Sequence, residues 1–334
     1  SRLALDHNAI NLSQGFPDFD CTKELRDLFT KAINSGLNQY PPMAGVPILR
    51  ERIAEKMHRL YDIDYDPEHE VTVVPGATYG IFTAIATCIR PGDEVILFEP
   101  AYDCYEPAIT TVGGTPVFIP LELPDYHVDW SKVEAAITPR TRMIVMNTPH
   151  NPTATVLSAE DMRVLERLLE GTDIVVASDE VYEHIVFDGA AHESMARQEA
   201  LRQRSFIVGS FGKTYSVTGW KMGYVVAPAP LSAEFRKAHQ FVTFSSFTPV
   251  QYALADFLNE RRGWPELSAF YQRKRDLFLD LLKGSRWKPL PSRGTYFQLL
   301  DYSDITSEKD MDFALRLTRE HGVASIPTSA FLYK

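Results

Sequence analysis

A lysine follows an apolar run in the segment Val208-Gly-Ser-Phe-Gly-Lys-Thr-Tyr-Ser-Val-Thr-Gly-Trp-Lys-Met-Gly-Tyr224. Ligand sites in open α/β sheets lie at the carboxyl ends of strands, and Lys213 stands at such an end. A lysine amine forms a Schiff base when it is neutral. Its ordinary pKa is about 10.4, so neutrality near pH 7 requires a shift worth roughly 4–5 kcal/mol. An isolated lysine is usually a solvated loop residue, but the glycines and hydroxyl groups around Lys213 favour a Schiff-base lysine.

An acidic residue follows the apolar run Ile174–Ala177, in the segment Ser178-Asp-Glu-Val-Tyr182. The carboxylate of Asp179 is suited to hold a protonated pyridine nitrogen, which makes a cofactor ring an electron sink. Tyr182 is close enough in sequence to reach an oxygen on the same ring. Two alternatives stay open for Asp179. It could cap the following turn, or it could bind a metal with Glu180 and His184, although no ligand-spaced His/Cys set supports a metal.

Two turns after other apolar runs also carry polar groups. Pro75-Gly-Ala-Thr78 stands at a strand-to-helix junction, where free backbone N–H groups favour a phosphate. Such turns are common, so this signal is weak alone. Asn147-Thr-Pro-His-Asn-Pro-Thr153 places Asn151 where its amide could donate to a ring oxygen. The alternative is an ordinary proline-rich turn.

The elements that must position these residues alternate along the chain. Short β-branched runs suit strands buried on both faces, and they occur at residues 71–74, 95–98, 116–119, 143–146, 174–177, 206–208 and 224–227. Ser158-Ala-Glu-Asp161 resembles a capping box that begins a helix over 162–170. Strands alternating with helices predict an α/β fold with a mostly parallel central sheet flanked by helices.

The last third of the chain has a different pattern. Residues 231–282 read as helical, with breaks near Thr248-Pro249 and Gly263-Trp264-Pro265. A smaller α+β piece then follows, with a strand expected at 295–300, a helix at 307–320 and a strand at 323–326.

Composition excludes several classes of protein. The 334 residues carry 34 basic and 44 acidic side chains, a net charge of −10, which disfavours nucleic acid as the main partner. No apolar stretch approaches the roughly 20 residues of a membrane span. The three cysteines, Cys21, Cys88 and Cys104, do not suggest a disulfide framework, so a cytoplasmic location is expected. A nicotinamide dehydrogenase is disfavoured because no GxGxxG follows a strand.

Taken in order, these motifs and several others span nearly the whole chain. They are Asn11-Leu-Ser-Gln-Gly-Phe-Pro-Asp18, Asn38-Gln-Tyr40 with Gly45, Gly76-Ala-Thr78, Glu99-Pro-Ala-Tyr-Asp-Cys-Tyr105, His150-Asn-Pro-Thr153, Ser178-Asp-Glu-Val-Tyr-Glu-His184, Ser210-Phe-Gly-Lys-Thr214, Gly219-Trp-Lys221 and Gly294-Thr-Tyr296. The set resembles the class I/II aminotransferases of pyridoxal-phosphate (PLP) fold type I. Within them it is similar to the branch of methionine and kynurenine/glutamine aminotransferases.

The resemblance implies a role for each matching residue. Lys213 would hold PLP as a Schiff base and move the substrate proton, and Asp179 would pair with the pyridine nitrogen. The remaining cofactor contacts would be Tyr182 and Asn151 at the ring oxygen, Tyr102 on the ring face, the Gly76 turn with Ala77 and Thr78, Ser210 and Lys221 at the phosphate, and Tyr40 at the phosphate of a neighbouring subunit. Gly15 would lie against the substrate carboxylate.

The resemblance also implies a reaction and an assembly. An uncharged amino acid (methionine, glutamine or aromatic) would give its amino group to a 2-oxo acid by a ping-pong mechanism in a homodimer with shared sites. A large PLP domain would span residues 35–284, and residues 1–34 with 285–334 would form a small domain. A PLP-dependent cysteine-conjugate β-lyase is the alternative reaction, and a non-catalytic PLP-sensing domain is the alternative that is not an enzyme.

The chain departs from the family pattern in two ways. Ala154 stands where the family usually has glycine. The family's leading segment, and the stretch after Phe331 with the arginine for the substrate α-carboxylate, are not in the sequence. We therefore expect it to be part of a longer protein, and we assign no such arginine.

Overall fold

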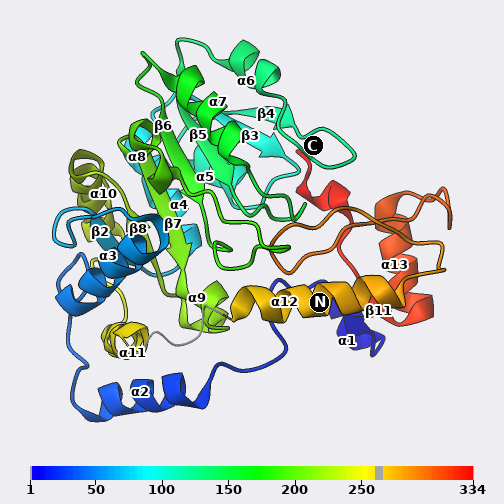
Figure 1. Ribbon diagram of the computed structural model, residues 1–334, viewed down its shortest axis with the longest axis horizontal. Helices are drawn as coiled ribbons and strands as arrows, with labels where there is room; N and C mark the ends of the chain where they lie inside the picture. Colours follow the sequence, from blue (N-terminus) through cyan, green and yellow to red (C-terminus); the bar gives the residue numbers. More distant parts are fainter. Residues whose placement is uncertain (1, 260–265, 334) are drawn as a thin grey trace.

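The computed structural model describes residues 2–259 and 266–333 and is built around a seven-stranded sheet (Figure 1). Its order is β2-β8-β7-β6-β5-β3-β4, in which only β8 runs antiparallel to its neighbours. The strands are β2 (Val71–Val74), β3 (Glu94–Glu99), β4 (Thr115–Pro120), β5 (Thr141–Asn147), β6 (Val175–Asp179), β7 (Ser205–Ser210) and β8 (Gly223–Val226). The mostly parallel sheet and its seven predicted runs are confirmed.

Helices cover both faces of this sheet. Alternate residues of a strand point to opposite faces, so Val95 and Leu97 pack with one set of helices and Ile96 and Phe98 with the other. The first set is α4 (Ala77–Cys88), α5 (Tyr105–Thr111) and α10 (Ala229–Val242). The second is α3 (Pro47–Tyr61), α6 (Trp130–Ala136), α7 (Ala159–Leu169) and α11 (Thr248–Asn259). Both faces of the sheet are therefore buried under helices, as the β-branched runs predicted.

Two predicted helix starts are present. Ser158 accepts a hydrogen bond from the backbone N–H of Asp161, and Asp161 accepts one from Ser158, so the capping box before α7 is confirmed. Thr248 is the first residue of α11, which confirms the first predicted break. The second, at residues 263–265, lies outside the described residues.

Segments from the two parts of the chain near its ends meet at one end of the molecule, while the last described residues lie beside β3 and β4 (Figure 1). Strand β1 (Ile10–Asn11) pairs in parallel with β11 (Val323–Ala324), and α1 (Arg2–Asp6) packs on α13 (Asp310–His321). Helix α2 (Lys23–Asn34) packs on α11, and α12 (Leu267–Leu281) precedes the antiparallel pair β9 (Lys288–Pro289) and β10 (Leu300–Asp301). We propose that residues 1–34 and 285–334 form the small domain beside 35–284.

The strand expected over residues 295–300 was wrong for most of its length. Only Leu300 belongs to a strand, and Thr295 has a φ of 62°, in the left-handed region that interrupts a strand. The backbone N–H of Thr295 donates to the carbonyl of Ile185 instead. This turn directs Phe297 toward the cavity described below.

The remaining elements are short. They are α8 (Glu199–Arg202), α9 (Phe211–Thr214) and the 3₁₀ turns η1 (Met195–Arg197), η2 (Thr218–Trp220) and η3 (Thr328–Phe331). Within the described ranges, no helix is both long enough and apolar enough to cross a bilayer.

Candidate active site

A cavity of about 310 Å³ lies at the carboxyl ends of β6 and β7 and the N-terminus of α4. It brings together residues that are far apart in the sequence, which is typical of ligand sites in open α/β sheets. The predicted site residues that line it are Gly15, Gly76, Ala77, Thr78, Tyr102, Asn151, Asp179, Tyr182, Ser210, Lys213 and Lys221.

Tyr40 is the predicted site residue that does not line this cavity. Its side chain is 83% exposed, and its ring packs edge-on against Phe244 with the centroids 5.4 Å apart. The exposed position of this side chain therefore does not support a role for Tyr40 in the cavity of its own chain.

Asp179 is the last residue of β6 and is buried. Burial raises the pKa of its carboxyl group to about 6, although hydrogen bonds from Tyr105 and from the backbone of Val181 oppose the rise. The Tyr105 hydroxyl donates to Oδ2 at 2.7 Å, and the Val181 N–H donates to Oδ1 at 3.3 Å. The site thus offers a buried acidic group that is ionised at neutral pH and faces a cavity.

Lys213 extends from α9, directly after β7. Its Nζ donates to the carbonyl of Gly15 at 2.8 Å and to the hydroxyl of Tyr296 at 3.0 Å. Burial lowers the pKa of the amine to about 8, Asp179 opposes the change and Lys221 adds to it. A pKa of about 8 leaves roughly a tenth of this amine neutral at pH 7, the form that acts as a nucleophile or base.

The N-terminus of α4 forms a cradle for an anion. Gly76 has a φ of 93°, and within the described part of the chain no side chain caps this helix. A Cβ on Gly76 would lie 3.2 Å from Cε of Lys221, so glycine lets that lysine approach the helix end. Free N–H groups and a helix dipole favour a phosphate. Thr78, Ser210 and Lys221 line the same cavity as this helix end.

Asn147 connects the loop after β5 to Asp179. Its Nδ2 donates to the backbone carbonyl of Asp179 at 2.9 Å, and its Oδ1 accepts from the N–H of Asn151 at 2.7 Å. Asn151 Oδ1 is buried and has no partner within the described residues, although Asn151 lines the cavity. A hydrogen-bond donor on a bound ligand would satisfy this oxygen. Ala154, where glycine was expected, has a φ of 61°, a region that favours glycine.

Sequence reasoning assigned no role to two tyrosines of the site. Tyr105 bonds to Asp179, and Tyr296 contacts Lys213, the carbonyl of Gly15 and, at 3.4 Å, the hydroxyl of Tyr182. Both stand in motifs that carry the family resemblance. The motifs signalled their importance, but their contacts depend on the tertiary fold.

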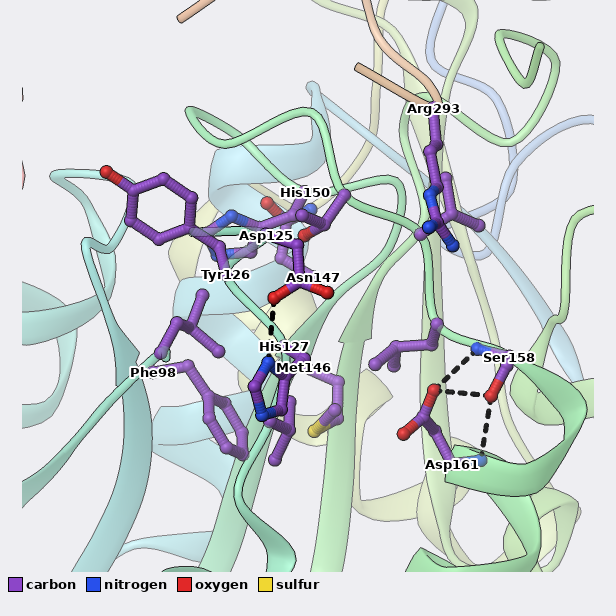
Figure 2. Close-up of a pocket in the computed structure, with 15 residues that line it drawn as sticks. Phe98, Asp125, Tyr126, His127, Met146, Asn147, His150, Ser158, Asp161 and Arg293 are labelled. Carbon is purple, nitrogen blue, oxygen red and sulfur yellow. Dashed lines mark hydrogen bonds and ion pairs between the residues drawn. The ribbon is translucent and has the colours of Figure 1, made fainter. Parts of the chain in front are cut away.

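Asn147 and His150 line a smaller cavity of about 160 Å³ (Figure 2). Arg293 and the pair of His127 and Asp125, 2.8 Å apart, also line it. Neither Lys213 nor Asp179 reaches this space. The groups suited to chemistry are therefore gathered in the larger cavity.

Comparison with known proteins agrees with this arrangement. Residues 7–334 match the family model described as aminotransferase class I and II. The chain is 49% identical to a methionine aminotransferase of Escherichia coli, over 99% of this chain and 86% of that protein. It is 38% identical to a probable N-succinyldiaminopimelate aminotransferase of Mycobacterium tuberculosis (99% and 84%) and 34% identical to a kynurenine–oxoglutarate transaminase of Dictyostelium discoideum (99% and 85%).

A solved structure extends the comparison to three dimensions. The chain superposes on the crystal structure of YbdL from Escherichia coli, for which a methionine aminotransferase function was identified, with a TM-score of 0.98. The two are 49% identical, and the match covers 100% of this chain and 88% of YbdL.

Proposed function

The chain belongs to the class I and II aminotransferases, and from this premise we propose that its larger cavity binds pyridoxal 5′-phosphate. We propose that the enzyme moves the amino group of an uncharged amino acid to a 2-oxo acid by a ping-pong mechanism. One observation carries the proposal: a partly neutral lysine and a buried carboxylate, Lys213 and Asp179, share one cavity with an anion cradle.

Each part of the cofactor has a matching group in the cavity. Lys213 would hold the cofactor by its aldehyde carbon, and Asp179 would hold the pyridine nitrogen. The other contacts would be Asn151 and Tyr182 at the ring oxygen, Tyr102 on the ring face, and Gly76, Ala77, Thr78, Ser210 and Lys221 around the phosphate, because all of these residues line the cavity. Bound PLP supplies an electron sink for the substrate carbanion.

The residues of the chain supply proton transfer and positioning. Lys213, once its amine is free, takes the proton from the substrate Cα and later returns it as a general acid. Tyr296 and the carbonyl of Gly15 hold this amine, because both lie within hydrogen-bond distance of Nζ. Gly15 lines the cavity, and we propose that it lies against the substrate carboxylate.

Uncharged donors such as methionine, glutamine or aromatic amino acids suit the chain. Members of the family that act on dicarboxylates use a second arginine. In this chain, the stretch where that arginine would be expected, residues 239–248, contains three phenylalanines and no arginine. A side-chain carboxylate buried without a cation would be strongly disfavoured. The 49% identity to a methionine aminotransferase supports the same class of donor.

Two experiments test this proposal. Borohydride reduction of the purified yellow protein should fix the cofactor on Lys213, and Lys213→Ala should lose the label while Lys221→Ala keeps it. A label on Lys221 would contradict the assignment. A donor screen with one fixed 2-oxo acid should give methionine a higher kcat/KM than aspartate or N-succinyldiaminopimelate, and the reverse order would overturn the substrate class.

A further inference from the structure

Residues 179–183, at the end of β6 and just after it, direct some side chains into the cavity and others into the core. Asp179 and Tyr182 line the cavity, but the residue directly after each is a buried glutamate that does not. Glu180 and Glu183 are 1% and 8% exposed. Each cofactor-facing side chain is therefore next to an acidic group anchored on the other side of the backbone.

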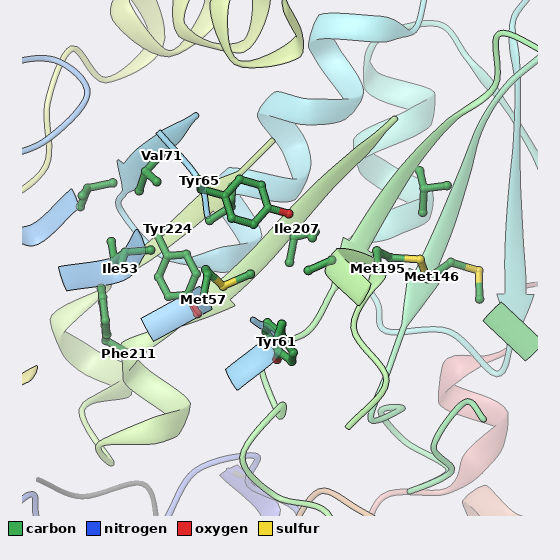
Figure 3. Packing of buried hydrophobic residues seen from close by; sticks show 14 of the residues in the cluster. Ile53, Met57, Tyr61, Tyr65, Val71, Met146, Met195, Ile207, Phe211 and Tyr224 are labelled. Atoms are coloured by element: carbon green, nitrogen blue, oxygen red, sulfur yellow. The ribbon is translucent and has the colours of Figure 1, made fainter. Parts of the chain in front are cut away.

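Glu183 has three partners from two different elements. Its carboxylate contacts Nζ of Lys56, and it accepts hydrogen bonds from the hydroxyls of Tyr61 at 3.0 Å and Tyr224 at 2.8 Å. Lys56 is 2% exposed, and its Nζ also contacts the Tyr224 hydroxyl. Figure 3 shows Tyr61 of α3 and Tyr224 of β8 among the buried apolar side chains of their cluster.

Glu180 is anchored separately. It accepts from Ser178 Oγ at 2.8 Å and from the backbone N–H of Met195 at 3.1 Å, and it lies 2.9 Å from Nε2 of His192. The two glutamates therefore hold both ends of residues 179–183, the segment that carries Asp179 and Tyr182.

The charges around Glu183 keep it ionised. Burial alone would raise the pKa of its carboxyl group, but the Lys56 ammonium lowers it to about 2. Burial in turn lowers the pKa of Lys56, and Glu183 opposes that change. His184 Nε2 lies 3.6 Å from Oε1, and Glu180 is the other carboxylate in this part of the core. A buried ion pair is weak evidence for stability, because apolar replacements are often as stable, but its directed contacts can fix geometry.

We propose that the buried pair of Lys56 and Glu183 positions Tyr182 and, through the short segment 179–183, Asp179. Neither residue of the pair lines the cavity, so both are positioning residues. This inference rests on the proposed PLP chemistry. A misplaced Tyr182 donates less well to the ring oxygen, and the oxygen then competes more strongly for the cofactor's titrating proton. The pH midpoint of the cofactor's visible absorption band should therefore rise.

The test uses the PLP-loaded enzyme and separates positioning from stability. Lys56→Met leaves Glu183 without its cation, so the unfolding midpoint should fall. Lys56→Met combined with Glu183→Gln removes both charges, keeps an acceptor oxygen for one of the two tyrosine hydroxyls and offers the other hydroxyl an N–H donor, so the unfolding midpoint should return toward wild type. The absorbance midpoint should stay raised by about 0.5–1 pH unit, with kcat lowered several-fold and KM for the amino donor little changed.

A milder pair of variants covers the case in which the double variant does not fold. Tyr61→Phe removes one hydrogen bond to Glu183 and should raise the absorbance midpoint by a smaller amount. Tyr65→Phe is the matched control, because the buried Tyr65 hydroxyl has no hydrogen-bond partner among the described residues, and this change should leave the absorbance midpoint at the wild-type value.

The outcomes are distinct. A folded double variant with the wild-type absorbance midpoint and kcat would overturn the inference, as would Tyr61→Phe behaving like Tyr65→Phe. A wild-type protein without the visible band would contradict the proposed function itself.

Discussion

The hydroxyl of Tyr105 donates a 2.7 Å hydrogen bond to Oδ2 of Asp179, and both residues are buried. This contact joins the first turn of α5 to the end of β6. Burial raises the pKa of Asp179 to about 6, and the Tyr105 bond is the largest effect that opposes the rise. Tyr105 therefore helps to keep Asp179 ionised at neutral pH, as its proposed role beside a protonated pyridine requires.

Removing this hydroxyl should make Asp179 a weaker acid. A hydrogen bond to a charged group contributes about 1.5–3 kcal/mol, which corresponds to a rise of roughly one to two units in the Asp179 pKa. Carboxyl ¹³C NMR of the cofactor-free Tyr105→Phe variant measures that pKa directly. PLP should also bind more weakly to this variant at pH 7. Tyr102→Phe is the control, and an equal pKa in the two variants would show that Tyr105 does not act on Asp179.

Asp179→Asn should separate stability from activity. The folded pKa of Asp179, about 6, is raised above the usual 3.8, so the protonated form stabilises the fold. That contribution is fully present below about pH 4 and is lost as the pH rises through 6. Above pH 6 the cofactor-free Asn variant should therefore unfold with a free energy higher by up to roughly 3 kcal/mol.

Urea unfolding at pH 4 and at pH 7.5 measures this difference, which should disappear at the lower pH. Turnover of the PLP-loaded variant should be nearly lost, because a neutral amide cannot hold the pyridine proton. A variant that is less stable at pH 7.5, or that turns over normally, would show that Asp179 is only a structural cap.

The pKa of Lys213 should respond in opposite directions to its two charged neighbours. Burial lowers this pKa to about 8, the Asp179 carboxylate raises it and the Lys221 ammonium lowers it. In the cofactor-free protein, Asp179→Asn should therefore move the Lys213 pKa below 8, and Lys221→Met should move it above 8. The pH dependence of acylation at Lys213, followed by peptide mass spectrometry, reports both shifts. Shifts of the same sign would contradict this account of the site.

The fold was predictable from the sequence because most of its strands are short β-branched runs buried on both faces. Their carboxyl ends converge, so Lys213 and Asp179, which each follow such a run and are 34 positions apart, could be assigned to one site. The contacts of Tyr105 and Tyr296 could not be predicted, because they join elements whose approach depends on the whole fold. The prediction of a strand at residues 295–300 was wrong because the apolar pattern does not reveal the left-handed φ angle of Thr295.

Lys56 illustrates a signal that was present but not used. Leu49, Ile53 and Met57 recur at helical spacing on the buried face of α3, and Lys56 lies on that face. A lysine among inward-facing apolar residues indicates a buried acidic partner. The identity of that partner, Glu183, required the structure because 127 residues separate the two.

The position of Tyr40 predicts a site shared between two copies of the chain. Its side chain is 83% exposed and contacts Phe244, and Phe241 and Phe247 nearby in sequence are 85% and 56% exposed. Exposed aromatic side chains on a single chain are typical of an interface. We therefore expect a homodimer by sedimentation, and the family resemblance implies that Tyr40 of each chain serves the phosphate of the other.

Mixed dimers test this sharing directly. Lys213→Ala and Tyr40→Ala chains should each form poorly active homodimers. In a dimer of one chain of each kind, the site that keeps Lys213 receives the intact Tyr40 of the other chain, so it should regain wild-type turnover. If Tyr40 served its own chain, both sites of the mixed dimer would stay defective. Activity that does not rise on mixing, or a fully active monomer, would contradict the shared site.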